Sequence, residues 1–221
     1  PKQNNFMFLF EELRVSEFVQ SYGFTQNDAI APCVDDIISY KHPEFKGKSI
    51  SFLELYDITK VQYNVCVTNI HTSECEVWNH ITQPHMPVSF GIRVSTCIPI
   101  LFSPIFYNGS YYIDGAVSNT FPSNCVSDQS HMLGMKIIQK KKSEPIQGLF
   151  HFLSKIVSAL FYMSTISTNP DNVIYLYQGS QPWDLNSGYS ELCALYESSV
   201  VDIDSVIFFK VKEKSQEKEK V

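Results

Sequence analysis

The stretch that decides the fold covers residues 93–122 and reads RVSTCIPILFSPIFYNGSYYIDGAVSNTFP. An Asn-Gly pair, Asn108 and Gly109, lies between two aromatic-rich arms, Pro104–Tyr107 and Ser110–Ile113. Asn-Gly suits the two central positions of a type I′ turn, where both residues take positive φ. The two arms are therefore predicted to pair as a β-hairpin.

The second arm of this hairpin delivers Asp114 at its end, followed by Gly115 and Ala116. Gly115 is expected to let the backbone turn tightly, and Ala116 to leave room beside the carboxylate. Apolar neighbours in the hairpin are expected to raise the pKa of Asp114. An acid held rigidly at a strand end and still reachable is a candidate catalytic group, whereas an isolated Asp-Gly more often marks an Asx turn.

Composition indicates one core-rich domain. A chain of 221 residues with 44% hydrophobic content is long enough for one sizeable, well-filled core. The formal net charge of −6 argues against a general nucleic-acid binder. The six cysteines form no C-x-x-C pair, and we interpret them as reduced thiols rather than a disulfide framework: Cys33, Cys66, Cys75, Cys97, Cys125 and Cys193.

The periodicity of apolar residues predicts interleaved helices and strands. Helices are expected over residues 5–22, 51–56, 88–96, 149–163 and 188–197, with another beginning after Thr25 or Asn27 as its N-cap. Gly23 is expected to end the first of them, and Ser51 with Glu54 predicts a capping box. Strands are expected over residues 63–69, 75–79, 132–138, 173–177 and 206–211. This alternation predicts an α/β layered fold over residues 1–211, followed by a charged, disordered tail at 212–221.

The helix predicted over residues 149–163 has two interpretations. Its apolar positions could cover a protein core, or they could lie on a membrane surface. Its polar face carries one lysine and no basic stripe, which favours the core-covering role. Too many polar residues interrupt it for a bilayer span.

Four consecutive segments resemble the patatin-like phospholipases and follow the order of that family: SISFLELYDITK (49–60), VQYNVCVTNIHTSECEVW (61–78), PHMPVSFGIRVSTCIPILFSPI (84–105) and YYIDGAVSNTFP (111–122). The resemblance implies a three-layer α/β/α sandwich and a lipid acyl hydrolase with a Ser–Asp dyad. It implies that Asp114 is the dyad acid, supported by Gly115 and Ala116, and that no cofactor or metal is needed. It also implies a lipid ester substrate, met peripherally at a membrane surface or lipid droplet, and a cytoplasmic or peripheral membrane location.

The chain departs from that family in its nucleophile. The family's Gly-rich oxyanion loop and G-x-S-x-G elbow are expected upstream of the region corresponding to Phe6–Tyr22, and no serine of these 221 residues is framed by glycines in that pattern. Because the chain begins with Pro1, we expect an N-terminally truncated, downstream portion of such a domain that is inactive by itself. The alternative is a catalytically inactive patatin-like module that binds lipid or a protein partner.

A metal site is a weaker hypothesis. His71, Cys75, His80 and His85 fall within fifteen residues, but their spacing matches no standard zinc pattern. We therefore favour structural roles for all four.

Three polar residues of the 93–122 stretch remain. Ser95 and Thr96 have no base adjacent in sequence and are interpreted as hydrogen-bonding residues at a helix end. Arg93 is expected either to hold the loop through backbone carbonyls or to face solvent, and the sequence does not decide between them.

Overall fold

The computed structural model describes residues 15–126, 132–139, 145–146, 148–165 and 173–178. The chain forms two compact units. The larger unit comprises residues 10–127 and 146–168, and the smaller one comprises residues 1–9, 128–145 and 169–221.

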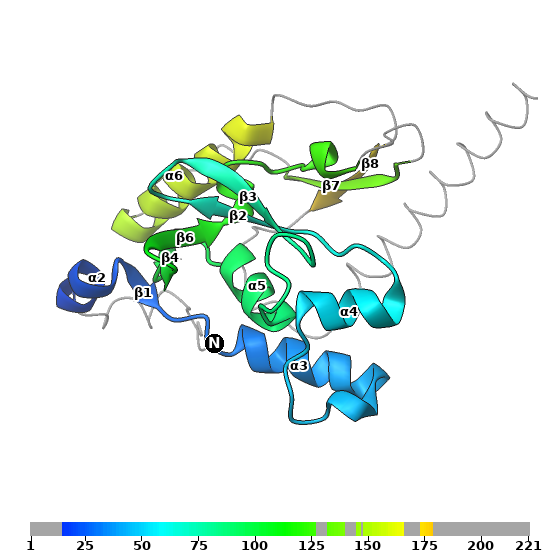
Figure 1. The fold of residues 1–221 in the computed structure, drawn as a ribbon. Helices are drawn as coiled ribbons and strands as arrows, with labels where there is room; N and C mark the ends of the chain where they lie inside the picture. Colours follow the sequence, from blue (N-terminus) through cyan, green and yellow to red (C-terminus); the bar gives the residue numbers. More distant parts are fainter. Residues whose placement is uncertain (1–14, 127–131, 140–144, 147, 166–172, 179–221) are drawn as a thin grey trace, which may run out of the picture. The chain divides into compact units, whose positions relative to one another are not determined.

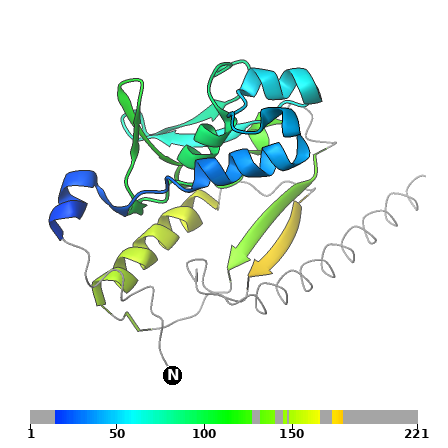
Figure 2. The ribbon, with the colours of Figure 1, turned by 90° about the horizontal axis from the view of Figure 1, so that it is seen from below.

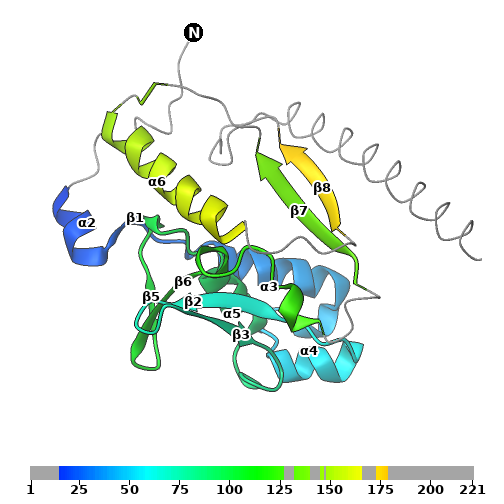
Figure 3. The same ribbon diagram turned by 90° about the horizontal axis from the view of Figure 1, so that it is seen from above.

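A four-stranded antiparallel sheet lies in the larger unit, in the strand order β3-β2-β6-β5 (Figure 1; β5 is labelled in Figure 3). Its strands are β2 (Val65–Asn69), β3 (Glu74–Trp78), β5 (Ile105–Tyr107) and β6 (Ser110–Asp114). The strands predicted over residues 63–69 and 75–79 are confirmed, with ends that differ by one or two residues. Within the described residues this unit also holds a short parallel pair, β1 (Gly23–Thr25) and β4 (Ile100–Phe102).

The helices of the larger unit are α2 (Val15–Ser21), α3 (Ile30–Lys41), α4 (Phe52–Thr59), α5 (Val88–Ser95) and α6 (Gly148–Thr165), with single 3-10 turns η1 (Pro43–Phe45), η2 (Gly115–Val117) and η3 (Ser123–Cys125). Helix α5 contacts β2 and β6, and α3 packs against α5 (Figure 1). The hydrophobic core lies between these elements and comprises Ile50, Phe52, Val65, Val67, Trp78, Met86, Val88, Val94, Cys97, Ile105 and Tyr112.

Helix α4 begins as its sequence predicts. The Ser51 hydroxyl accepts a hydrogen bond from the Glu54 backbone at 3.3 Å, and the Glu54 carboxylate accepts one from the Ser51 backbone at 2.8 Å. These reciprocal bonds satisfy two N–H groups that a helix start otherwise leaves unpaired. The predicted capping box is confirmed.

Two predictions about neighbouring helix ends are wrong. Helix α2 ends before Tyr22, which itself takes the positive φ of 59°, so Gly23 does not end the helix. Gly23 lies in β1, where a Cβ would come 2.3 Å from the Ser103 nitrogen, so close approach of two strands requires the glycine. Neither Thr25 nor Asn27 caps α3, whose N-cap is Ala29 with no side-chain bond.

Helix α6 confirms the predicted helix over residues 149–163 (Figure 3). It contacts η2, and Val157 is buried. Phe152, Ile156 and Leu160, however, keep 45, 38 and 42% of their surface exposed. Only part of the predicted apolar face therefore covers the protein interior.

The smaller unit contains the parallel pair β7 (Gly134–Gln139) and β8 (Val173–Gln178), which run side by side in Figure 2. These confirm the strands predicted over residues 132–138 and 173–177. The predicted helix 188–197, strand 206–211 and tail 212–221 lie outside the described residues, as does the first part of the helix predicted over residues 5–22.

The chain contains both helices and strands, which in places follow one another in runs such as β4–β5–β6, so the mixed α/β character of the predicted fold is confirmed. In the part of the chain that the structure describes, no helix combines the length and apolarity that crossing a bilayer would need.

Candidate active site

The predicted hairpin is present and carries Asp114 to the end of β6. Strands β5 and β6 pair antiparallel through Phe106 and Tyr111, and the turn residues Asn108 and Gly109 take φ values of 45° and 84°. Both φ values are positive, as a type I′ turn requires. The local sequence signal at Asn-Gly therefore sets the register that places the acid.

The backbone on both sides of Asp114 is held by the neighbouring segments. Its N–H donates to the Cys97 carbonyl at 2.9 Å, and its carbonyl accepts from the Thr68 hydroxyl at 2.8 Å. Its carboxylate Oδ1 accepts from the Ala116 N–H at 2.8 Å, which caps the short helix η2. Two hydrogen bonds to other segments thus hold the backbone of Asp114, and a third, from Ala116, holds its carboxylate.

A glycine is required at position 115 for a different reason from the one expected from the sequence. A Cβ at this position would lie 2.1 Å from the carbonyl oxygen of Cys66. Gly115 shows no positive φ in the structure. The glycine is therefore required because η2 begins directly against strand β2, and not because the chain turns through a left-handed conformation.

Burial raises the pKa of Asp114 to about 6, and the Ala116 N–H opposes part of that rise. Asp114 pairs directly with Val67 across the sheet, so both side chains lie on the same face, and Val67 is fully buried. The predicted rise in pKa is confirmed, but the core residues of β2 contribute to the apolar surroundings as well as the hairpin's own residues.

Cys97 lies beside this acid. Its thiol donates to the Ser103 carbonyl at 3.1 Å. Burial, reinforced by the negative charge of Asp114, raises the pKa of Cys97 to about 12. The buried thiol is therefore protonated at neutral pH and acts as a compact apolar neighbour rather than a nucleophile.

The loop after Cys97 is strained. Ile100 begins β4 with a φ of 72°, a conformation that β-branched residues rarely adopt. A hydrogen bond from the Phe102 N–H to the Ile98 carbonyl at 2.9 Å, together with the pairing of β4 with β1, holds the loop in this shape. Such strain persists only where the surrounding structure enforces it, and it is frequent at functional sites.

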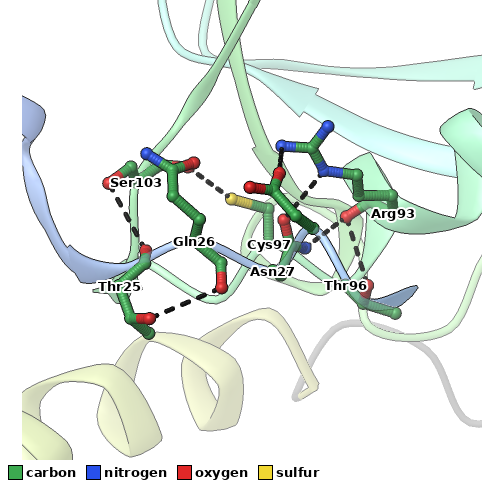
Figure 4. Close-up of polar contacts among 8 residues, drawn as sticks. Thr25, Gln26, Asn27, Arg93, Thr96, Cys97 and Ser103 are labelled. Atoms are coloured by element: carbon green, nitrogen blue, oxygen red, sulfur yellow. Dashed lines mark hydrogen bonds and ion pairs between the residues drawn. The ribbon is translucent and has the colours of Figure 1, made fainter. Parts of the chain in front are cut away.

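Arg93 and Asn27 join α5 to the segment before α3 (Figure 4). The Asn27 amide donates to the Arg93 carbonyl at 2.7 Å, and the Arg93 Nε donates to the Asn27 Oδ1 at 3.2 Å. The guanidinium also forms an ion pair with Asp28. Both expectations for Arg93 are therefore wrong: among the described residues its side chain binds a side-chain amide and a carboxylate, and it neither donates to backbone carbonyls nor simply faces solvent.

The remaining polar residues of the stretch behave as predicted. The Ser95 hydroxyl donates to the Cys66 carbonyl at 2.7 Å, and the Thr96 hydroxyl donates to the Ile92 carbonyl at 3.0 Å (Figure 4 shows Thr96). Both satisfy backbone carbonyls around the end of α5 and in β2, which is the helix-end role expected from the sequence.

The histidines take separate places. His71 accepts from the Tyr111 N–H at 3.3 Å, and His80 stacks on the Tyr56 ring at a centroid distance of 3.8 Å. Among the described residues, no group of three or more His, Cys, Asp or Glu side chains is arranged to hold a metal ion. Five of the six cysteines are described and all five are free thiols, which agrees with the reduced state that we predicted; Cys193 lies outside the described residues.

Sequence reasoning missed Thr68 as part of the site. The buried Thr68 hydroxyl bonds both the Asp114 carbonyl and the Ser118 hydroxyl, each at 2.8 Å. A threonine in a β-strand carries no sequence signal for this role, because the residues that it joins are almost fifty positions further along the chain.

The site therefore consists of one half-buried carboxylate at a strand end of a mixed α/β domain. The family profile described as patatin-like phospholipase matches residues 6–124, more than half of the chain, and the chain belongs to this family.

Individual relatives match over shorter parts. The chain is 37% identical over 104 residues to a probable lipid hydrolase, 463L, of Invertebrate iridescent virus 6, which covers 45% of this chain and 36% of that protein. It is also similar to the crystal structure of VipD from Legionella pneumophila, with 18% identity and a TM-score of 0.42 over 67% of this chain and 35% of VipD. The chain thus spans about a third of the length of each protein.

Proposed function

We propose that this chain contributes the acid of a Ser–Asp dyad in a lipid acyl hydrolase, with Asp114 as that acid. The observation that carries the proposal is a carboxylate at the end of β6 with its pKa raised to about 6 by burial and with its position held by Cys97, Thr68 and Ala116. Membership of the patatin-like phospholipase family supports a lipid ester as the substrate class.

The proposed chemistry depends on where the proton goes. A serine hydroxyl that attacks an ester carbonyl must lose its proton as the bond forms. A carboxylate with an ordinary pKa near 4 is a poor acceptor, whereas one near 6 is closer to the working pH and accepts the proton more readily. Asp114 Oδ1 already accepts from Ala116, and among the described residues Oδ2 has no hydrogen-bond partner. We therefore assign the transferred proton to Oδ2.

This sequence contains no G-x-S-x-G motif, so none of its serines has the flanking glycines expected of the dyad serine. We propose that the nucleophile and its oxyanion donors come from polypeptide outside these 221 residues, and that the chain alone hydrolyses no ester. The proposed complete domain is a three-layer α/β/α sandwich that acts on phospholipid or acylglycerol esters at a membrane surface or lipid droplet. Residues 1–211 would be this chain's share of that domain.

The test compares variants of Asp114 and Asp57, both in a form of the protein that carries the serine and in the 221-residue chain alone. In a form that also carries a glycine-framed serine, Asp114→Asn is expected to lower fatty-acid release on the order of a thousandfold. Asp57→Asn is the matched control, because the Asp57 side chain is 63% exposed and pairs only with Lys60 among the described residues. Circular dichroism and thermal unfolding of each variant verify that the fold is retained.

Two results would contradict the proposal. Unchanged turnover in Asp114→Asn would remove Asp114 from the dyad. Fatty-acid release by the purified 221-residue chain that depends on Asp114 would show that the nucleophile lies within it. Binding of lipid vesicles by both forms, without hydrolysis by either, would favour the alternative of an inactive binding module.

A further inference from the structure

Three cysteine thiols from separate segments meet on the face of the sheet opposite Asp114. Cys75 pairs directly with Thr68 across the β2–β3 ladder, and Cys66 lies two residues before Thr68, so Cys66 and Cys75 share one face. Asp114 pairs with Val67 and lies on the other face. The thiols of Cys75 and Cys125 both lie close enough to the Cys66 thiol to raise its pKa.

The segment that carries Cys125 is seated directly on this face. It starts at Gly115, which touches the Cys66 carbonyl, and the Ser118 hydroxyl lies 2.8 Å from the Thr68 hydroxyl. It ends in η3, where the Cys125 N–H donates to the Pro122 carbonyl at 3.0 Å. The contact between Cys66 and Cys125 therefore joins the far end of this segment, which we name the η2–η3 segment (residues 115–125), to strand β2.

Backbone geometry distinguishes which two thiols can close a bond. Cys66 and Cys75 occupy diagonal positions of an antiparallel ladder, where Cα atoms are about 7–8 Å apart. A disulfide usually needs Cα atoms within about 4.4–6.8 Å, so the ladder disfavours a Cys66–Cys75 bond. Cys125 lies in a 3-10 turn outside every ladder of the described residues, so no strand pairing fixes its distance from Cys66.

We propose that this thiol cluster is an oxidation site at which a low-molecular-weight disulfide, such as oxidised glutathione, converts Cys66 and Cys125 into a disulfide that fastens the η2–η3 segment to β2. The Cys125 thiolate attacks one sulfur of the glutathione disulfide, and the first glutathione leaves as a thiolate. The Cys66 sulfur then attacks the Cys125 sulfur of this mixed disulfide, and the second glutathione leaves. In total two protein thiols are oxidised and one glutathione disulfide is reduced to two glutathione thiols.

Cys75 serves in this scheme as the acceptor for the proton that Cys66 releases. The hydrogen bond from the Cys66 thiol, and a further one from the Ser118 hydroxyl, lower the pKa of Cys75, whereas the contacts with Cys75 and burial raise the pKa of Cys66. Cys75 is therefore the more acidic thiol of the pair and lies next to the thiol that must lose a proton. The proposal does not depend on the hydrolase function, because it involves neither Asp114 nor a lipid.

The test is a mass-spectrometric map of the full chain after incubation with oxidised glutathione and alkylation of the remaining thiols. Digestion with trypsin and an enzyme that cleaves after glutamate separates Cys66 from Cys75, because Glu74 lies between them. The expected product links the Cys66 peptide to the peptide that contains Cys125, with a mass lower by two hydrogens than the sum of the free peptides. Because that second peptide also contains Cys97, the link must be absent in Cys125→Ser.

One further thiol and one further variant serve as controls. Cys33 is an exposed thiol, and it is expected to end as a simple mixed disulfide with glutathione. Cys75→Ser is expected to form the same Cys66–Cys125 link roughly tenfold more slowly, because it lacks the acidic thiol beside Cys66 that takes up the proton.

Several results would overturn the proposal. One is recovery of Cys66 and Cys125 as alkylated thiols under conditions that fully convert Cys33. Another is a link between Cys66 and Cys75, or a Cys66–Cys125 link that persists as the main product when the chain is oxidised in denaturing urea. A Cys75→Ser rate equal to that of the parent chain would remove the proton-transfer step.

Discussion

Replacing the candidate catalytic acid should make the protein more stable at neutral pH, and this prediction tests the burial of Asp114 without any activity assay. In the folded chain burial raises the pKa of Asp114 to about 6, whereas an unfolded chain leaves an aspartate near about 4. Between these pH values the folded state keeps the proton and the unfolded state releases it. The free energy of unfolding must therefore fall as the pH rises from about 4 through about 6.

The size of the effect follows from the shift in pKa. A difference of about two units corresponds to about 3 kcal/mol of destabilisation above pH 6, at about 1.4 kcal/mol per unit. Asp114→Asn has nearly the same shape and cannot ionise, and its side-chain oxygen can still accept from Ala116. An unpaired amide N–H would offset about 1 kcal/mol of the gain. The expected net stabilisation is about 2 kcal/mol at pH 7.5. Below about pH 4 the gain is lost and the unpaired N–H should leave Asp114→Asn about 1 kcal/mol less stable than the parent chain.

The assay is urea unfolding at a series of pH values between 4 and 8, followed by tryptophan fluorescence. Trp78 is buried in the same core as the site, and a Trp183→Phe background leaves it as the only tryptophan. Asp57→Asn, at an exposed carboxylate, should change the free energy of unfolding by less than about 0.5 kcal/mol at any pH. The reasoning is refuted if Asp114→Asn is less stable than the parent chain at pH 7.5, or if its advantage does not depend on pH.

The same unfolding assay examines three further contacts. Gly115→Ala should lower the free energy of unfolding by about 3 kcal/mol, because the added Cβ overlaps the backbone of β2. Gly47→Ala is the control: its Cβ would lie in open space, and the positive φ alone should cost about 1 kcal/mol. Equal losses in the two variants would contradict the close approach of Gly115 to β2. Asn27→Ala should cost about 2 kcal/mol, since the Arg93 carbonyl and Nε lose their partner, and a loss below about 0.5 kcal/mol would show that this contact is not formed in solution. Ser51→Ala removes the capping box and should cost about 1 kcal/mol, with a matching loss of helix signal in circular dichroism; an unchanged midpoint would count against the cap.

The features that the sequence predicts well are those set by residues close together in the chain. Asn108-Gly109 specifies a turn by its own backbone preferences, and Ser51 with Glu54 specifies a helix start within one turn. Asp114 follows at the end of the hairpin arm because strand pairing propagates from the turn. These local preferences do not depend on which other segments pack against the turn or the helix start.

The tertiary structure decided the features that depend on residues far apart in the chain. Gly115 is a glycine because η2 meets the Cys66 carbonyl, and Asn27 bonds Arg93 instead of capping its own helix. The pKa of Asp114 depends on the burial that Val67 shares with it across the sheet. Local backbone preference determines where a strand or turn begins, but desolvation and close approach arise only when separate segments pack together. For that reason the sequence alone placed Asp114 at the end of a strand, and only the fold showed which contacts hold it and which burial raises its pKa.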